Sequence, residues 1–200
     1  TDGTFGPERS MTRSEAAAIF ARLLADKNGD TITTVAVTKF SDIPKHAWYS
    51  GYVKYLTGYG VVTGMSDGTF APNEPVTRAQ FTAMAVRFFE AYGDGDAEIM
   101  EQYAEFNDVS SGYWAAEYIR EAAIFGWIKG YGDGTFFPDN DITREQMATI
   151  LYRYAQYMDV DVSVGEDTNI LSYADFDEIS EYAIPALQWA CGAGVITGVT

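Results

Sequence analysis

Three arginines each directly follow a threonine, in the pairs Thr12-Arg13, Thr77-Arg78 and Thr143-Arg144. Cations are scarce in this chain, because 13 Lys and Arg stand against 29 Asp and Glu and the net charge is −16. An arginine in the first turn of a helix opposes the helix dipole, which favours acids there, so its repetition indicates a task. A guanidinium beside free N-terminal amides would bind a carboxylate. The alternative is a salt bridge to Asp or Glu that ties repeats together.

The helices that would position these arginines are indicated by local patterns. Capping boxes predict three helix starts, at Thr12-x-x-Glu15, Thr77-x-x-Gln80 and Thr143-x-x-Gln146. Apolar residues follow each box at helical spacing. Shorter helices are predicted around 52–56 and 118–122, and Gly60, Gly126 and Gly194 stand where such helices end. We expect Asp42, Asp108 and Asp175 to cap the shorter helices.

These elements recur with a period of about 66 residues, and such internal repeats define the organisation of a chain. The turn Asp-Gly-Thr-Phe occurs at 2–5, 67–70 and 133–136. The predicted segments are the second half of a first repeat with its linker (1–39), two complete repeats with linkers (40–105 and 106–172), and the first half of a further repeat (173–200). The half at 173–200 could pair with 1–25, within one chain or between two, and complete a third unit.

Composition excludes several classes of protein. A net charge of −16 repels nucleic acid. No run of about 18 apolar residues occurs, so we expect no membrane insertion. Cys191 is the only cysteine, which excludes an intramolecular disulfide and a cysteine-based zinc site.

Catalysis and metal binding are also disfavoured. His46 is the only histidine, in a loop that no other repeat shares, and no pair of carboxylates is marked out for hydrolysis. The segment 26–30 begins like a calcium loop, but Thr31 and Val37 stand where glycine and a bidentate acid are required. We therefore expect no enzyme activity, no metal and no cofactor.

The order of these motifs resembles the S-layer homology family over nearly the whole chain except its linkers. The resemblance rests on an aromatic-x-Asp start, a Trp-containing helix, a Gly-x-x-x-Gly-x-x-Asp-Gly-Thr-Phe turn and a Thr-Arg-x-Glu/Gln helix. It implies an all-α fold of tandem repeats around a pseudo-three-fold axis, with short Asp-Gly-Thr-Phe turns. It also implies a secreted, non-catalytic module on the surface of Gram-positive bacteria that binds anionic, often pyruvylated, secondary cell-wall polysaccharide.

The resemblance places glycan-binding residues in grooves between the repeats. These residues are the arginines Arg13, Arg78 and Arg144, the threonines Thr12, Thr77 and Thr143, and the aromatic residues Trp48, Trp114 and Tyr131. Aromatic faces stack on sugars but also fill cores, and the threonines could act as helix caps and as donors to sugar. Lys129 is an auxiliary cation or a solvated surface residue. The last unit has Glu181 and Tyr182 and no Trp in this region, so we expect a weaker groove there.

One alternative function remains open at this point. The repeats could mediate protein–protein assembly of a bacterial surface layer, with self-association through the truncated repeat ends.

Overall fold

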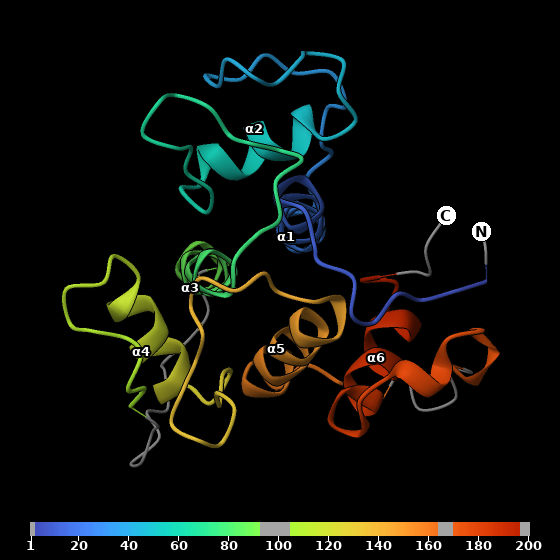
Figure 1. The fold of residues 1–200 in the computed structure, drawn as a ribbon. Helices are drawn as coiled ribbons and strands as arrows, with labels where there is room; N and C mark the ends of the chain where they lie inside the picture. The colour runs from blue at the N-terminus through green and yellow to red at the C-terminus, as the bar shows by residue number, and fades with distance from the viewer. Residues whose placement is uncertain (1–2, 93–104, 164–169, 197–200) are drawn as a thin grey trace.

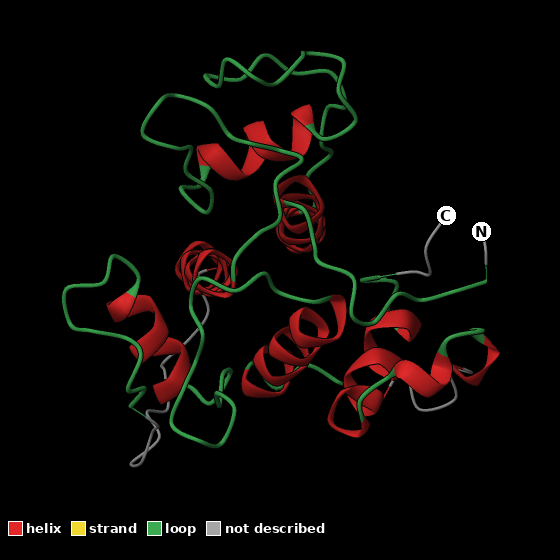
Figure 2. Cartoon of the chain, in the orientation of Figure 1, coloured by secondary structure: helices red, strands yellow, loops and turns green. Residues whose placement is uncertain are grey.

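The computed structural model describes residues 3–92, 105–163 and 170–196, and the secondary structure in them is helical. Figure 2 shows helices joined by loops, with no strand in the described part. The all-α prediction is therefore confirmed. None of the described helices combines the length and apolar character needed to cross a membrane. The α-helices are α1 (Arg13–Asn28), α2 (Ser50–Gly58), α3 (Arg78–Tyr92), α4 (Ala116–Ile124), α5 (Arg144–Tyr157) and α6 (Ile184–Gly192).

The helices form three pairs, each a long helix packed against the short helix that follows it: α1 with α2, α3 with α4, and α5 with α6. Figure 1 shows the long helices around a common centre and the short helices outside them. Aromatic rings connect the long helices, because Phe88 of α3 lies 5.2 Å from Phe20 of α1 and 5.6 Å from Tyr154 of α5 between ring centroids. The apolar faces of the long helices therefore form one shared core.

The long helices begin where the capping boxes predict. The Thr12 and Thr143 hydroxyls accept the backbone amides of Glu15 and Gln146, and those side chains accept the threonine amides in return. The box at Thr77 and Gln80 has the same two bonds, at 3.2 and 3.3 Å. The predicted helix ends are also confirmed, because the three glycines adopt positive φ: Gly60 (76°), Gly126 (73°) and Gly194 (68°).

Just before each Thr-Arg pair, a closed ring of backbone hydrogen bonds joins the three repeats. Val76 N donates to Met11 O at 2.8 Å, Ile142 N to Val76 O at 3.0 Å, and Met11 N to Ile142 O at 3.1 Å. All three side chains are fully buried. Because only isolated bridges form among the described residues here, the repeats meet through single residues rather than a sheet.

The prediction that Asp42, Asp108 and Asp175 cap the short helices is wrong. Each carboxylate instead accepts two backbone amides at the end of an Asp-Gly-Thr-Phe turn, with distances of 2.6–2.8 Å: Asp42 from Phe70 and Ala71, Asp108 from Phe136 and Phe137, and Asp175 from Phe5 and Gly6. The amides lack another regular partner, so a carboxylate from the preceding segment satisfies them. The Asp175 contact brings the two ends of the chain together.

Candidate functional site

The Thr-Arg arginines join neighbouring repeats. Each Nε donates to the phenylalanine carbonyl of the next Asp-Gly-Thr-Phe turn: Arg13 to Phe70 at 2.7 Å, Arg78 to Phe136 at 2.8 Å and Arg144 to Phe5 at 3.0 Å. Each guanidinium carbon also lies 4.5–4.8 Å from the centroid of the same phenylalanine ring. All three arginines are 6% exposed, and burial lowers the pKa of each. At Nε, a hydrogen bond to a neutral backbone carbonyl therefore takes the place of the salt bridge to Asp or Glu that the sequence suggested as an alternative.

The expectation that free helix amides help to form a carboxylate site is wrong. The amides of the first two residues of each long helix donate to backbone oxygens of another repeat, with Arg13 N bonded to Glu74 O at 3.0 Å and Ser14 N to Pro72 O at 3.0 Å. The same two bonds recur at Arg78 and Ala79, and at Arg144 and Glu145. The third amide is held by the capping threonine. The first amides of the long helices are therefore not available to an anion.

The terminal nitrogens of two of these arginines border open clefts. Arg13 Nη1 donates to Gln80 Oε1 at 3.1 Å, and Arg78 Nη1 donates to Gln146 Oε1 at 3.0 Å. The glutamines that complete the capping boxes of α3 and α5 therefore also orient the arginine of the preceding repeat. One residue thus connects the helix start to the cleft.

We call the cleft beside Arg13 the first cleft. It has a volume of about 490 Å³. Its lining includes Arg13 from α1, Thr77 and Gln80 from the start of α3, Arg87 from further along α3, and Trp114 and Asp139 from the loops. Trp114 is 54% exposed, so its ring is available to a ligand. Three of the residues predicted to bind glycan, Arg13, Thr77 and Trp114, lie in the lining of this cleft.

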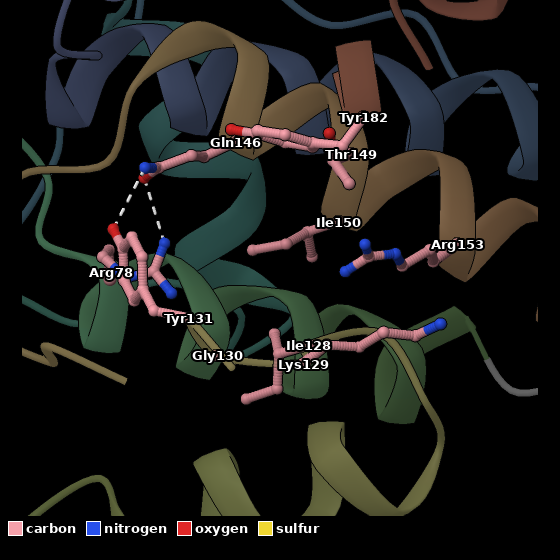
Figure 3. Close-up of a pocket in the computed structure, with 10 residues that line it drawn as sticks. All are labelled: Arg78, Ile128, Lys129, Gly130, Tyr131, Gln146, Thr149, Ile150, Arg153 and Tyr182. Carbon is pink, nitrogen blue, oxygen red and sulfur yellow. Dashed lines mark hydrogen bonds between the residues drawn. The ribbon is translucent and has the colours of Figure 1, made fainter. Parts of the chain in front are cut away.

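We call the cleft beside Arg78 the second cleft. It has a volume of about 350 Å³. Its lining includes Arg78, Lys129, Tyr131, Gln146, Arg153 and Tyr182, all drawn in Figure 3. The Tyr131 ring lies 4.8 Å from the Arg78 guanidinium, and Gln146 Nε2 donates to its hydroxyl at 3.1 Å. Arg78 and Tyr131, each predicted as a site residue, are therefore held together by direct contacts.

The two clefts are built from equivalent positions. Trp114 and Tyr182 each lie two residues before a short helix, and each lines a cleft. The last unit therefore supplies Tyr182 where the preceding unit has Trp114, and the weaker groove that we expected there stays a prediction. Glu145, which is 2% exposed, fixes this ring by accepting the Tyr182 hydroxyl at 2.7 Å and the Ser180 hydroxyl at 2.8 Å.

Other predicted residues lie outside these two clefts. Thr12 and Thr143 act as helix caps, and Trp48 is 53% exposed, with edge contacts to Tyr49 and Tyr52. Arg144 contacts Phe5 and is not among the residues that line either cleft. Their binding roles stay predictions.

Sequence reasoning did not select Arg87, Arg153 or Tyr182 as site residues. A signal for the arginines is present, because an arginine follows each Thr-Arg arginine by nine positions, at Arg22, Arg87 and Arg153. Nine positions are two and a half helical turns, so these residues lie well along the same helix. Tyr182 could have been found by its place relative to Trp114.

Comparison with known proteins identifies the family of the chain. A family model described as the S-layer homology domain matches residues 1–17, 39–82 and 105–148, more than half of the chain. "Cell surface glycoprotein 1" of Acetivibrio thermocellus is 36% identical over 159 residues, which are 76% of this chain and 7% of that protein. "Cellulosome-anchoring protein" of the same organism is 32% identical over 183 residues, 91% of this chain and 40% of that protein. "Surface-layer 125 kDa protein" of Lysinibacillus sphaericus is 30% identical over 169 residues, 82% of this chain and 13% of that protein.

The chain spans less than half of the length of each of these relatives. Its repeated motifs, its helix pairs and the extent of the family match lead to one assignment. The chain belongs to the S-layer homology domain family.

Proposed function

We propose that this chain is a non-catalytic module that anchors a larger protein to the bacterial cell wall, outside the cell. In this role it binds an anionic secondary wall polysaccharide, for example one with pyruvylated sugars, through the two clefts. The family supports anchoring, as do relatives named as a cellulosome-anchoring protein and a surface-layer protein. An endoglucanase and an amylopullulanase also match, over 16% and 8% of their lengths, which fits a module separate from a catalytic domain.

The observation that carries the proposal is the recurrence of one cleft design. Each cleft combines a buried guanidinium, oriented by a glutamine, with an exposed aromatic ring and a second arginine. A guanidinium suits a carboxylate, and an aromatic face suits a sugar ring. In a chain of net charge −16, such a concentration of cations favours an acidic carbohydrate over a neutral one.

The test is a pull-down with wall sacculi of Acetivibrio thermocellus, either native or stripped of secondary polysaccharide with hydrofluoric acid. We expect the chain to sediment with native sacculi only. The variant W114A/Y131A should lose sedimentation while its unfolding curve is retained, because both rings are about half exposed. Tyr59→Ala removes a similarly exposed ring outside both clefts and should bind normally.

Two outcomes would contradict the proposal. Equal sedimentation with stripped sacculi would favour protein–protein assembly or peptidoglycan binding. Normal sedimentation of W114A/Y131A would remove the clefts from the interaction.

A further inference from the structure

The second arginine of each long helix meets a different partner in each helix pair. The Arg22 guanidinium lies 5.2 Å from the centroid of the Tyr52 ring, and that of Arg87 lies 4.7 Å from that of Tyr118. Arg87 also donates Nε and Nη2 to the Tyr118 hydroxyl, at 3.1 and 3.0 Å. These tyrosines are the third residues of α2 and α4, and the third residue of α6 is Ala186. Arg153 therefore lacks the tyrosine that holds its two equivalents.

Arg153 is left with little to neutralise its charge. Among the described residues, its one hydrogen bond is a long contact of 3.5 Å from Nη1 to the Trp127 carbonyl. The side chain is half-buried, and burial lowers its pKa, although an arginine stays protonated. No carboxylate is among the described residues that line the second cleft, and Lys129 adds another cation. A partly desolvated charge without a counterion is unfavourable, so an incoming anion would be stabilised here.

The cations lie at opposite ends of the second cleft. In Figure 3, Arg78 lies at one end with Tyr131 and Gln146, and Arg153 and Lys129 lie toward the other end, with the Arg153 guanidinium pointing toward Ile150. Ile128 and Ile150 lie between them. A ligand that spans the cleft therefore meets positive charge, an apolar middle and positive charge again.

We propose that Arg153 and Lys129 form a second anion subsite, which binds a second carboxylate or phosphate group of the wall polysaccharide while its first acidic group lies at Arg78. This inference rests on the proposed function and adds that the ligand carries two anionic groups on one short segment. Arg153 supplies a planar fork for two oxygens, and Lys129 supplies a point charge.

The first cleft lacks an equivalent of this second group of cations. Arg87 there is bound to Tyr118, Thr63 stands where the second cleft has Lys129, and Asp139 adds a negative charge to the lining. The second subsite is therefore particular to the second cleft. The two clefts select differently charged segments of the polymer.

Calorimetry with soluble polysaccharide purified from Acetivibrio thermocellus walls tests this. We expect K129Q/R153Q to weaken binding by about tenfold or more, the size that loss of charged hydrogen bonds produces. The charge-matched control K45Q/R120Q changes exposed cations outside both clefts and should stay within about twofold. Arg87→Gln, the equivalent change in the first cleft, should weaken polysaccharide binding clearly less than K129Q/R153Q does. Urea unfolding of each variant verifies that the fold is intact.

Binding to chemically modified polysaccharide identifies the chemical class of its second anionic group. If carboxyl reduction of the polysaccharide removes the difference between wild type and K129Q/R153Q, the group is a carboxylate, and if dephosphorylation removes it, the group is a phosphate. A difference that survives both treatments would overturn the anion subsite.

Other outcomes separate this inference from the proposed function. Absence of wild-type binding would overturn both. Wild-type binding with K129Q/R153Q equal to its control, or with Arg87→Gln equally damaging, would overturn the second subsite alone.

Discussion

At the scale of single residues, the Thr-Arg arginines make their structural contacts with atoms other than those that we propose for binding. Nε of Arg78 and the face of its guanidinium are used by Phe136, whereas Nη1 is turned toward Gln146 at the cleft. The two interpretations of these arginines, as ties between repeats and as ligands for an anion, are therefore compatible. An alanine substitution would remove both roles and could not distinguish them.

Arg78→Lys tests the structural role on its own, because it keeps the positive charge and removes Nε and the planar fork. We expect a loss of about 1–3 kcal/mol in the free energy of unfolding, since the buried Phe136 carbonyl loses its donor. Urea denaturation measures this, with the exposed change Arg120→Lys as control, expected within about 0.5 kcal/mol. Unchanged stability of Arg78→Lys would mean that the bond to Phe136 contributes little to the fold.

At the scale of the helices, the sequence predicts those structural features that depend on residues only a few positions apart. Thr143 and Gln146 satisfy each other's amides over three positions, so the start of α5 can be deduced from the chain alone. Asp108 was wrongly expected to cap a helix, because its partners Phe136 and Phe137 lie 28 and 29 positions away. A carboxylate accepts amides in either setting, and only the fold decides which amides reach it.

For the candidate site too, some residues could be predicted from local motifs and others depend on the fold. Arg78, Tyr131 and Trp114 could be selected from repeated motifs, and the structure places them in clefts. Arg153 gains its importance from the substitution of Ala186 for a tyrosine on another helix. Which side chains face each other across α5 and α6 depends on tertiary packing, so the sequence pattern alone did not reveal it.

The capping box of α1 differs from the other two by carrying Glu15 rather than glutamine, and this predicts a pH dependence. Burial disfavours the Glu15 carboxylate, but hydrogen bonds from Arg9 and from Thr12 outweigh burial and hold its pKa below the ordinary value. A depressed pKa in the folded state means that the stabilisation is present above the unfolded value of about 4.3 and is lost as the pH falls through the folded value.

We therefore expect the urea midpoint of the wild type to fall more than that of Glu15→Gln as the pH is lowered from about 6 to about 3. Glu15→Gln is a matched change, because Gln80 and Gln146 already complete capping boxes at the equivalent positions. Parallel pH profiles for the two proteins would show that the bond to Arg9 adds nothing to stability.

At the scale of the whole molecule, the two ends of the chain are joined by the same contact that closes the complete repeats. Asp175 accepts Phe5 N and Gly6 N across about 170 positions, whereas Asp108 makes the equivalent bonds across 28 and 29. Asp175→Ala should therefore release the N-terminal segment as well as weaken the fold, because only there does the bond close a long loop.

Hydrogen exchange of the amides of residues 4–6 measures this release, with Asp108→Ala as the matched control that should leave them protected. Light scattering of the wild type should give a monomer, since the contact forms within one chain. A dimer that dissociates in Asp175→Ala would instead mean that the ends pair between two chains.

The charge distribution of the molecule predicts that salt raises both rate constants of polysaccharide binding, for two different reasons. At long range the chain repels a polyanion because its net charge is −16, whereas at contact the cations of the second cleft attract it. Between about 0.01 M and about 0.1 M salt, the screening length falls from about 30 Å to about 10 Å, so the long-range repulsion is removed first. The association rate should therefore rise with salt, and the dissociation rate should also rise as the contact ion pairs weaken.

Surface plasmon resonance separates the two rates. The variant K129Q/R153Q should keep the salt dependence of the association rate and lose part of the salt dependence of the dissociation rate. An association rate that falls with salt would mean that the field of the clefts, and not the net charge, controls the approach of the polymer.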